Sequence, residues 1–324
     1  SGRVSAGAHV DGTGGRLTVA KTVEFLVTGV ATGMLYALVA LGFVVVYKVS
    51  GVLNFAQGAL VAVGAFAVWW LVVRSGWLDP LGDGSVVEFL TACLVAAGVA
   101  AIVSAVIEVG LLRRLADEPA FSLAMVTVGA DIILRTLVAS RLPIGANAIG
   151  SPLAGRTLRL GDTSVAFVDV WTIGLAVGIV VLVGLALRYS RLGLAVRAVA
   201  IDREAAAAVG VPVPTVVTSA WCVAGVLAVV AATMQLSRSG QGLEPSTAFF
   251  ALRSFPAAIL GGLASLPGAI VGGLLVGLVE AYFQFFHPTA LGGNFHLVAP
   301  YAVMVAVLLF RPHGLFGTAE VGRA

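Results

Sequence analysis

The sequence predicts an all-α integral membrane protein, a polytopic bundle of about eight or nine transmembrane helices with one short cytoplasmic helix. Hydrophobic residues make up 59% of the 324 residues and charged residues only 11%, against about 25% charged in an ordinary soluble domain. The mean hydropathy is +1.05. Long apolar runs recur along the chain, and they do not alternate as the strands of a membrane barrel would.

This composition excludes several other classes of protein. Soluble domains, disordered chains and nucleic-acid-binding modules all need far more polar residues than these. The pI near 9.1 reflects a formal net charge of only +3, so no basic binding surface is expected. Cys93 and Cys222 lie in apolar runs and predict no disulfide framework. None of the four histidines has metal-ligand spacing, so no metal or cofactor is expected on this chain.

The apolar runs define the predicted elements in order, because a bilayer-spanning helix needs about 20 apolar residues. Residues 1–22 are polar and predict a disordered tail, residues 23–317 form a single transmembrane domain, and residues 318–324 form a C-terminal tail. The candidate spans are Phe25–Tyr47, Val52–Val73, Phe89–Leu112, Phe121–Ser140, Val170–Leu187, Thr215–Leu236, Ala248–Leu263, Pro267–Phe286 and Leu297–Phe310. Whether residues 248–286 form one broken segment or two decides between eight and nine crossings.

Clustered basic residues predict the orientation. Arg188, Arg191, Arg197 and Arg203 share one loop, and Arg113 and Arg114 lie in another loop on the same side. The positive-inside rule makes that side cytoplasmic. With nine crossings, the N-terminal tail then lies outside and the C-terminus inside.

The loop of residues 188–214 predicts a helix of its own, within a segment of about residues 198–212. Asp202 is suited to cap an N-terminus, and Ala205 to Ala208 are the best helix formers available. Gly210 stands where a glycine takes the left-handed conformation after a helix, and Pro212 prevents continuation. The small alanine face favours insertion into a protein groove, whereas an interfacial helix would carry large apolar anchors.

Four ordered stretches carry a resemblance to a known family. Glu204-Ala205-Ala206 followed by Gly210 resembles the EAA…G coupling motif of bacterial ABC importer permeases. More specifically, roughly residues 25–317 resemble the branched-chain amino-acid (Liv-type) permease family, in its smaller type of inner-membrane permease subunit. The matching stretches are YALVALGFVVVYKVSGVLNFAQG (36–58), RLGLAVRAVAIDREAAAAVG (191–210), FPAAILGGLASLPGAIVGGLLVGLVE (255–280) and RPHGLFG (311–317). Gln57 departs from the histidine usual in this family.

The resemblance implies a bacterial inner-membrane, multi-pass permease subunit that acts with several partners. These are a second related permease, two cytoplasmic ABC ATPases that hold ATP and Mg, and an extracellular or periplasmic substrate-binding protein. Asp202, Glu204, Ala205, Ala206 and Gly210 would then couple to an ATPase. The solute implied is a branched-chain amino acid or a related small polar or carboxylated molecule. No complete phosphate loop is present: residues 15–22 lack its second glycine and no predicted strand precedes them.

Polar residues within the spans are candidates for the translocation path, because each charge inside a membrane is costly. Asp131 and Arg135 lie four apart on one predicted helix and can pair with each other. Glu108 lies near the cytoplasmic end of its span, within reach of Arg113, and Glu280 lies deeper. Asn54, Gln57 and Gly58 predict either a gate at a locally irregular helix or hydrogen bonds between helices.

The glycines of the segment after residue 266 allow close helix approach. Gly268, Gly272, Gly273 and Gly277 form two small-xxx-small pairs, and with Pro267 they indicate either tight packing or a broken helix at a transport site. An ion-coupled secondary transporter remains the alternative function, with Asp131 as its one attractive carboxylate, although no inverted repeat is evident in the sequence. No zinc or Ser–His motif supports an intramembrane enzyme.

Overall fold

The computed structural model describes residues 14–78, 80, 84–116, 118–145, 147–160, 163–238, 240–286 and 295–317. Within these ranges, seven helices are long and apolar enough to cross a membrane, and α9 and α11 are shorter. The prediction of an all-α polytopic bundle is confirmed. The long helices and their extensions are α1 (Gly14–Ser50), α2 (Gln57–Trp69) with η1 (Trp70–Arg74), α3 (Val86–Ile107) with η3 (Glu108–Leu112) and η4 (Arg113–Leu115), α4 (Ala120–Ala139), α5 (Phe167–Tyr189), α8 (Val213–Leu236) and α10 (Leu266–Phe286); the shorter elements are α6 (Arg191–Ile201), α7 (Arg203–Ala208), η5 (Pro245–Ala248), α9 (Phe249–Gly261) and α11 (Phe295–Phe310).

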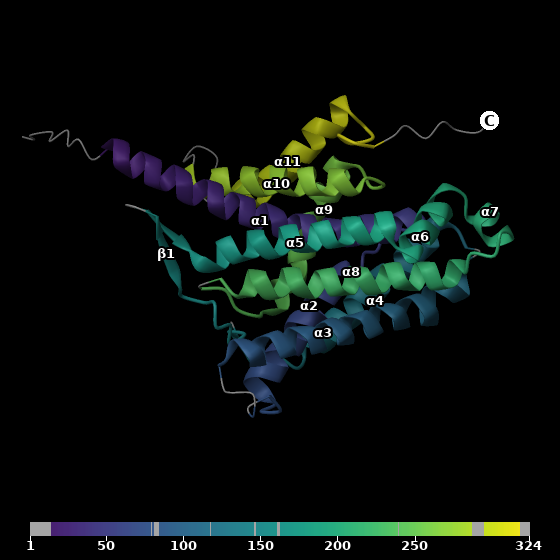
Figure 1. Cartoon of the computed structure of the whole chain (residues 1–324), viewed down its shortest axis with the longest axis horizontal. Coiled ribbons are helices and arrows are strands. Elements are labelled where there is room, and N and C mark those ends of the chain that lie inside the picture. The colour runs from purple at the N-terminus through teal and green to yellow at the C-terminus, as the bar shows by residue number, and fades with distance from the viewer. Residues whose placement is uncertain are drawn as a thin grey trace, which may run out of the picture.

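Helix α1 is the centre of the bundle. Of its most apolar 18-residue window 89% is buried, against 11% for α5. It packs against α10 on one side and α8 on the other, as the ribbon view shows (Figure 1). Small residues permit this contact, because a Cβ atom at Gly33 would lie 2.8 Å from the Cα of Leu274. The first predicted span is therefore surrounded by protein.

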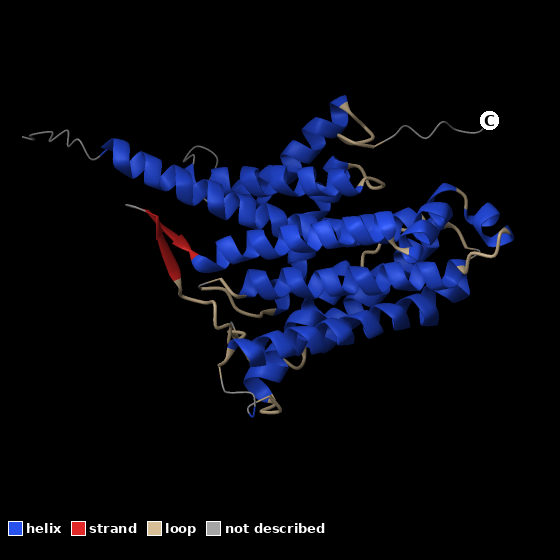
Figure 2. Ribbon diagram, viewed as in Figure 1, coloured by secondary structure: helices blue, strands red, loops and turns tan. Residues whose placement is uncertain are grey.

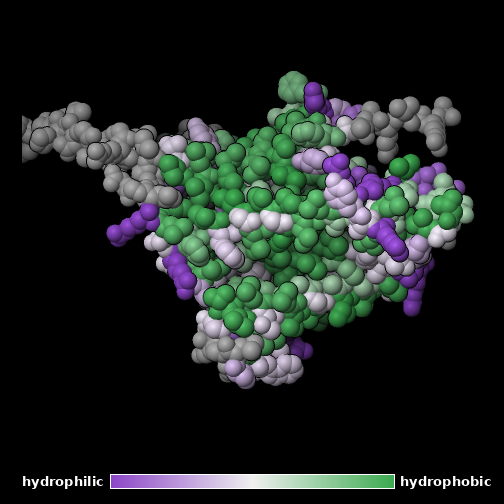
Figure 3. All heavy atoms as spheres, in the orientation of Figure 1, coloured by the Kyte–Doolittle hydropathy of each residue, from purple (hydrophilic) through white to green (hydrophobic). Residues whose placement is uncertain are grey.

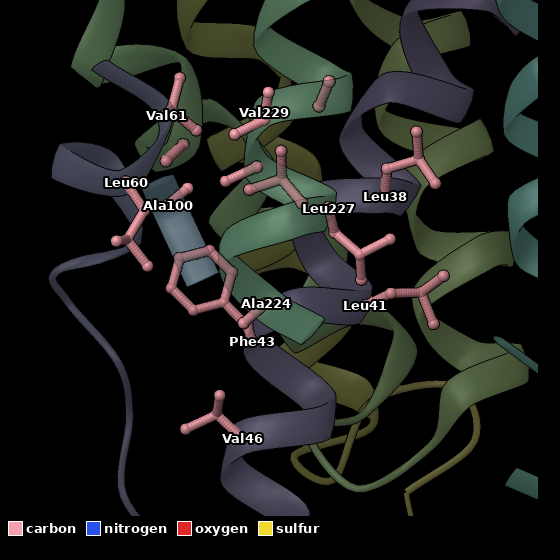
Figure 4. Close-up of a cluster of buried hydrophobic side chains, with 14 of the residues drawn as sticks. Leu38, Leu41, Phe43, Val46, Leu60, Val61, Ala100, Ala224, Leu227 and Val229 are labelled. Carbon is pink, nitrogen blue, oxygen red and sulfur yellow. The ribbon is translucent and has the colours of Figure 1, made fainter. Parts of the chain in front are cut away.

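A second contact layer joins α1 to α8, and α8 in turn to α2 and α3. Side chains from these helices interdigitate in the interior, among them Leu38 and Phe43 of α1, Leu60 of α2 and Leu227 of α8 (Figure 4). All four are buried. Dispersion contacts of this density are what hold helices together in a bilayer, where apolar burial gives little net gain.

The outer helices present apolar side chains to the surroundings. Leu94 and Ile102 of α3 and Leu182 of α5 are all more than 60% exposed. In the space-filling view an apolar surface covers the middle of the molecule, and hydrophilic residues gather towards the ends of the helices (Figure 3). Such a surface is stable only in lipid or against another membrane subunit, which agrees with a multi-pass membrane protein.

The two ends of the bundle differ. Helices α6 and α7 lie at the end predicted to be cytoplasmic, called the inner end below, and a two-stranded antiparallel sheet lies at the opposite, outer end (Figure 2). Strands β1 (Thr157–Leu160) and β2 (Thr163–Ala166) pair with Thr157 opposite Ala166. The sequence predicted no strand in this stretch, which lies between two candidate spans. Polar residues and leucines alternate along β1, as in a strand of a small hairpin.

The helix boundaries correct one prediction and decide between two alternatives. Helix α1 begins at Gly14, so residues 14–22 are helical where a disordered tail was predicted, since the apolar helix extends beyond the bilayer-sized window. Residues 1–13 and 318–324 lie outside the described residues. Residues 249–286 form two antiparallel helices and not one broken segment, because α9 and α10 pack face to face after the turn at Gly262, whose φ is +91°.

Candidate functional site

Helix α2 begins deep inside the bundle. Residues 51–56 leave α1 without regular structure, and α2 starts only at Gln57, five residues later than the predicted span. The Gln57 side chain donates from Nε2 to the carbonyl oxygen of Ala224, 3.1 Å away, and Ala224 lies in the middle of α8. Gly51, with a φ of +68°, begins the interruption. The second predicted span is thus an irregular stretch followed by a helix that runs to the outer end.

Polar contacts hold the irregular stretch in place. Asn54 donates from Nδ2 to Oε1 of Gln57 at 3.1 Å, and the backbone N–H of Phe55 donates to the Thr127 hydroxyl of α4 at 3.1 Å. Asn54 and Gln57 have 0% exposure. The sequence left two roles open for this pair, a gate or hydrogen bonds between helices. The contacts are those of hydrogen bonds between helices, and in this conformation neither side chain faces an open path.

A second interruption follows α8. After Leu236 the chain turns back into the bundle through η5, and α9 then runs to the inner end. A Cβ atom at Gly58 would lie 2.9 Å from the carbonyl oxygen of Ala248, so the start of α2 and the start of α9 meet. The same order of elements therefore occurs twice: a long helix, an interruption and a helix that starts inside the bundle. Helices α1 and α2 follow it in one direction across the bundle, and α8 and α9 follow it in the opposite direction. The sequence alone does not reveal this inverted relation.

Asp131 and Arg135 of α4 connect these two helix starts. They form the ion pair that their spacing predicts. The Asp131 carboxylate also accepts a hydrogen bond from the backbone of Ala59 in the first turn of α2, where the helix dipole favours an anion. The Arg135 guanidinium lies over the Phe249 ring of α9, 5.0 Å from its centroid. One buried pair therefore fixes the positive end of α2 beside the start of α9.

Glu280 lies on the other side of α9. The Tyr36 hydroxyl of α1 donates to its Oε2 at 2.5 Å, and both side chains are buried. The ring of Tyr36 is tilted against that of Phe250, with centroids 5.2 Å apart. The contact joins α10 to α1.

A polar cavity of about 320 Å³ opens between these elements. It extends from the end of α8 down along η5 into the first turn of α9. Glu244 and Arg253 lie on its wall, together with Gln235 and Gln241. Arg253 was not predicted as a site residue; its signal in the sequence is a single cation inside the apolar run FFALRSFPAAILG.

A buried ion pair at the outer end was also missed. Arg238, just past the end of α8, lies 3.0 Å from Asp169 in the first turn of α5. Thr28 of α1 donates to the same carboxylate at 3.0 Å, and Arg238 donates to the Thr32 hydroxyl at 2.8 Å. The cluster ties three helices together. The partners are distant in the sequence, so no spacing pattern indicates it.

The four glycines of α10 serve packing on two different faces. Gly268 and Gly272 face α9, where a Cβ atom would collide with the carbonyl oxygens of Gly261 and Ala257. Gly273 and Gly277 face α1, against Ala37 and Gly33. Pro267 lies in the first turn of α10, where its missing N–H leaves no bond unmade. The alternative of a break at Pro267 is not what the structure has.

The inner end carries the predicted short helix. The Asp202 carboxylate accepts from the N–H of Ala205 at 2.9 Å, which begins α7. Gly210 has a φ of +87°, and the N–H groups of Gly210 and Val211 donate to the carbonyls of Ala207 and Ala206, as in a Schellman motif. Both predicted end signals are confirmed. Helix α6, capped by Ser190, was not predicted.

One coupling residue lies differently from the expectation. Ala206 is 4% exposed and faces the bundle, because a helix of one and a half turns has one side against α8. Glu204 and Ala205 are exposed, and Ile201 and Val209 at the two ends of α7 are 87% and 79% exposed. The free surface of α7 is therefore small, apolar at both ends and acidic at Glu204.

A charged cluster supports α8 just behind this helix. The carboxylate of Glu108 accepts from the Arg113 guanidinium at 2.8 Å and from the Thr218 hydroxyl at 2.6 Å. Arg113 also donates to Thr218 at 2.7 Å. The predicted Glu108–Arg113 pair is confirmed, and it links the inner end of α3 to the first turns of α8.

Comparison with known proteins gives one consistent result. The profile of the branched-chain amino acid transport system permease component family matches residues 25–308. The chain is 31% identical to the high-affinity branched-chain amino acid transport system permease protein BraD of Pseudomonas aeruginosa, over 92% of this chain and 97% of that protein. It is 29% identical to LivH of Escherichia coli strain K12, over 92% and 96%. A probable LivH of Methanocaldococcus jannaschii is 28% identical, over 87% and 89%.

Proposed function

The chain belongs to the family of branched-chain amino acid transport permease components, and we propose that it forms one wall of a path for such an amino acid. It is a permease subunit of an ABC transporter and a multi-pass inner-membrane protein. Its family is not one of enzymes. In this proposal, ATP and Mg are bound by two separate cytoplasmic ATPase subunits, and a second permease and an external binding protein complete the importer.

The observation that carries the proposed path is the meeting of two helix starts inside the bundle. Discontinuous helices expose backbone N–H groups and the positive ends of dipoles at the depth where a membrane transporter holds its solute. Here the starts of α2 and α9 meet beside Asp131 and Arg135. Irregular backbone at that depth is tolerated where protein or a polar cavity surrounds it, and the cavity beside α9 is polar.

The surface of α7 supports coupling to an ATPase. The helix is fixed at both ends by its caps, projects from the inner end of the bundle (Figure 1) and exposes Ala205 with the apolar Ile201 and Val209. An exposed apolar tip is favourable when another protein covers it. The Glu108–Arg113–Thr218 cluster braces α8, which contacts α7 and whose Ala224 carbonyl holds the start of α2.

The contacts of Asp131 speak against the ion-coupled alternative. Its carboxylate is paired with Arg135 and also takes a backbone contact from Ala59, so the negative charge that a proton or sodium ion would need is already neutralised. The family is that of permease components of branched-chain amino acid ABC transporters, which gives no support to ion coupling.

The proposal is tested by placing the same cation at opposite ends of the bundle. Ala205→Arg enlarges the exposed side of α7, and Ala154→Arg puts the same side chain on an exposed outer turn. The permease is co-expressed with its ATPase and second permease partners. We expect Ala205→Arg to lower the co-purified ATPase and ATP-driven leucine uptake by about tenfold, while Ala154→Arg leaves both unchanged.

The expected results differ if α7 only lies on the membrane surface and binds no ATPase. A cation at the lipid surface is tolerated there, so both variants would then retain the ATPase. Unchanged co-purification of Ala205→Arg would remove the coupling role of α7. Loss of ATPase in both variants would point to general misfolding, which the yield of monodisperse permease measures directly.

A further inference from the structure

Arg253 is a membrane-embedded cation whose charge acts on the buried Glu280 but which makes no direct contact with a carboxylate in the part of the chain that the structure describes. It lies in the second turn of α9, one turn from Phe249, in an otherwise apolar helix. Its guanidinium makes no hydrogen bond and no ion pair with any described residue, whereas Arg113, Arg135 and Arg238 all have carboxylate partners. An intramembrane cation is costly and marks a functional site unless something neutralises it.

The Arg253 side chain lines the polar cavity between α8, η5 and α9. Glu244 lines the same cavity, and its carboxylate is fixed by the Ser246 hydroxyl at 3.1 Å and by the backbone of η5. No ion pair joins Glu244 to Arg253 within 4.0 Å. Two opposite charges therefore face one cavity with a gap between them.

The remaining wall of the cavity is mixed. Leu236, Phe249 and Phe250 contribute apolar surface, and Gln235 and Gln241 contribute amides. At about 320 Å³, the space falls in the range of small-ligand sites. A cation, an anion and an apolar wall around one space match the three parts of an apolar amino acid.

We propose that this cavity is a transient binding site for the zwitterion of an apolar α-amino acid, with its carboxylate on Arg253 and its ammonium group facing Glu244. The inference rests on the proposed function. The planar guanidinium presents two parallel N–H donors to a carboxylate, and the aliphatic side chain packs against Phe250 and Leu236. Because the first turn of α9 lies beside the helix starts, the site stands at the outer entrance of the proposed path.

The test uses a reporter cysteine in the assembled transporter. The complex of both permeases and both ATPases is placed in lipid nanodiscs without the binding protein, so that any protection comes from the membrane subunits. Gln241→Cys, on the cavity wall, is combined with Cys93→Ala and Cys222→Ala to remove the native thiols. Ala154→Cys in the same background is the matched control, since Ala154 is exposed at the outer end but not among the cavity residues.

The rate of modification by an uncharged methanethiosulfonate is measured with three probes of one shape. L-leucine has both charges, leucinol lacks the carboxylate and 4-methylpentanoate lacks the ammonium group. We expect millimolar L-leucine to slow modification of Gln241→Cys by about fivefold or more, and the other two to have little effect, because each leaves one charge unmatched. The control should react at the same rate with every probe.

Two substitutions assign the charges. Arg253→Gln should abolish protection by leucine. Arg253→Lys should retain part of it, because the lysine ammonium group keeps the positive charge but lacks the two parallel N–H donors of the guanidinium. Glu244→Gln keeps the cap of η5 but removes the anion, so 4-methylpentanoate should then protect as well as leucine. Should Arg253→Gln fail to assemble, Arg253→Lys and Glu244→Gln still decide the assignment.

Two results would overturn the site and leave the proposed function intact. One is leucine protection that survives Arg253→Gln, which would mean that the guanidinium pairs with the second permease. The other is absence of leucine protection in a complex that, with its binding protein, still takes up leucine on ATP. If the complete system takes up no branched-chain amino acid, the proposed function itself fails.

Discussion

Neutralising one member of the Asp131–Arg135 pair should destabilise the permease, and neutralising both should restore much of the loss. The side chains are 10% and 26% exposed, so the pair is largely buried. Removing one partner of a buried pair costs about 3–5 kcal/mol, because the other charge stays behind unpaired. Asp131→Asn leaves Arg135 with only the Phe249 ring, a contact of about 0.5–2 kcal/mol.

The two single changes should not be equal. Arg135→Met leaves Asp131 with the backbone N–H of Ala59, and a hydrogen bond to a charged group contributes about 1.5–3 kcal/mol. Arg135→Met should therefore lower the free energy of unfolding by about 1 kcal/mol less than Asp131→Asn does. The double variant carries no buried charge, and a coupling energy of about 2 kcal/mol is expected from the cycle.

The measurement is unfolding of the purified permease in a mixed-micelle denaturant titration, followed by tryptophan fluorescence. Trp221 is 1% exposed and reports on the interior. Arg159→Met on the exposed β1 strand is the control and should change stability by less than about 0.5 kcal/mol. If the double variant is no more stable than the worse single variant, the two charges act separately and the pairing argument is wrong.

Three other substitutions or conditions test the remaining features. Gly272→Ala should separate α9 from α10 and cost about 1–3 kcal/mol, whereas Gly98→Ala, which faces open space, should be neutral; denaturant unfolding distinguishes them. Gly210→Ala should cost about 1 kcal/mol locally, from its positive φ, and weaken ATPase co-purification while the permease yield stays unchanged. The purified permease alone should hydrolyse no ATP; turnover that survives removal of every ATPase subunit contradicts the division of labour.

Local patterns in the sequence were sufficient for several features. The Asp202 cap, the left-handed Gly210 and the Asp131–Arg135 pair all depend on residues within eight positions of one another. The helix geometry that joins such residues is the same in every helix, so spacing alone predicts the contact. Apolar runs likewise predict the long helices, because the bilayer fixes their length.

Features that depend on distant parts of the chain could not be predicted. Helix α2 begins at Gln57, whose side chain donates to a carbonyl 167 positions away. Arg238 finds Asp169 only once α5 and α8 lie together. The burial of Ala206 follows from the side on which α7 rests. In each case the deciding partner is set by the packing of the bundle, and composition carries no information about it.

The central position of α1 has a consequence for how the chain is made. It leaves the ribosome before every other helix that the structure describes, yet Tyr36 and its partner Glu280 are separated by 244 positions. At about 5–20 residues per second, α1 waits tens of seconds in the lipid before α10 is synthesised. During that time its glycine face has no partner. Premature termination before α10 would therefore leave a helix suited to protein neighbours stranded in the bilayer, a substrate for membrane quality-control proteases.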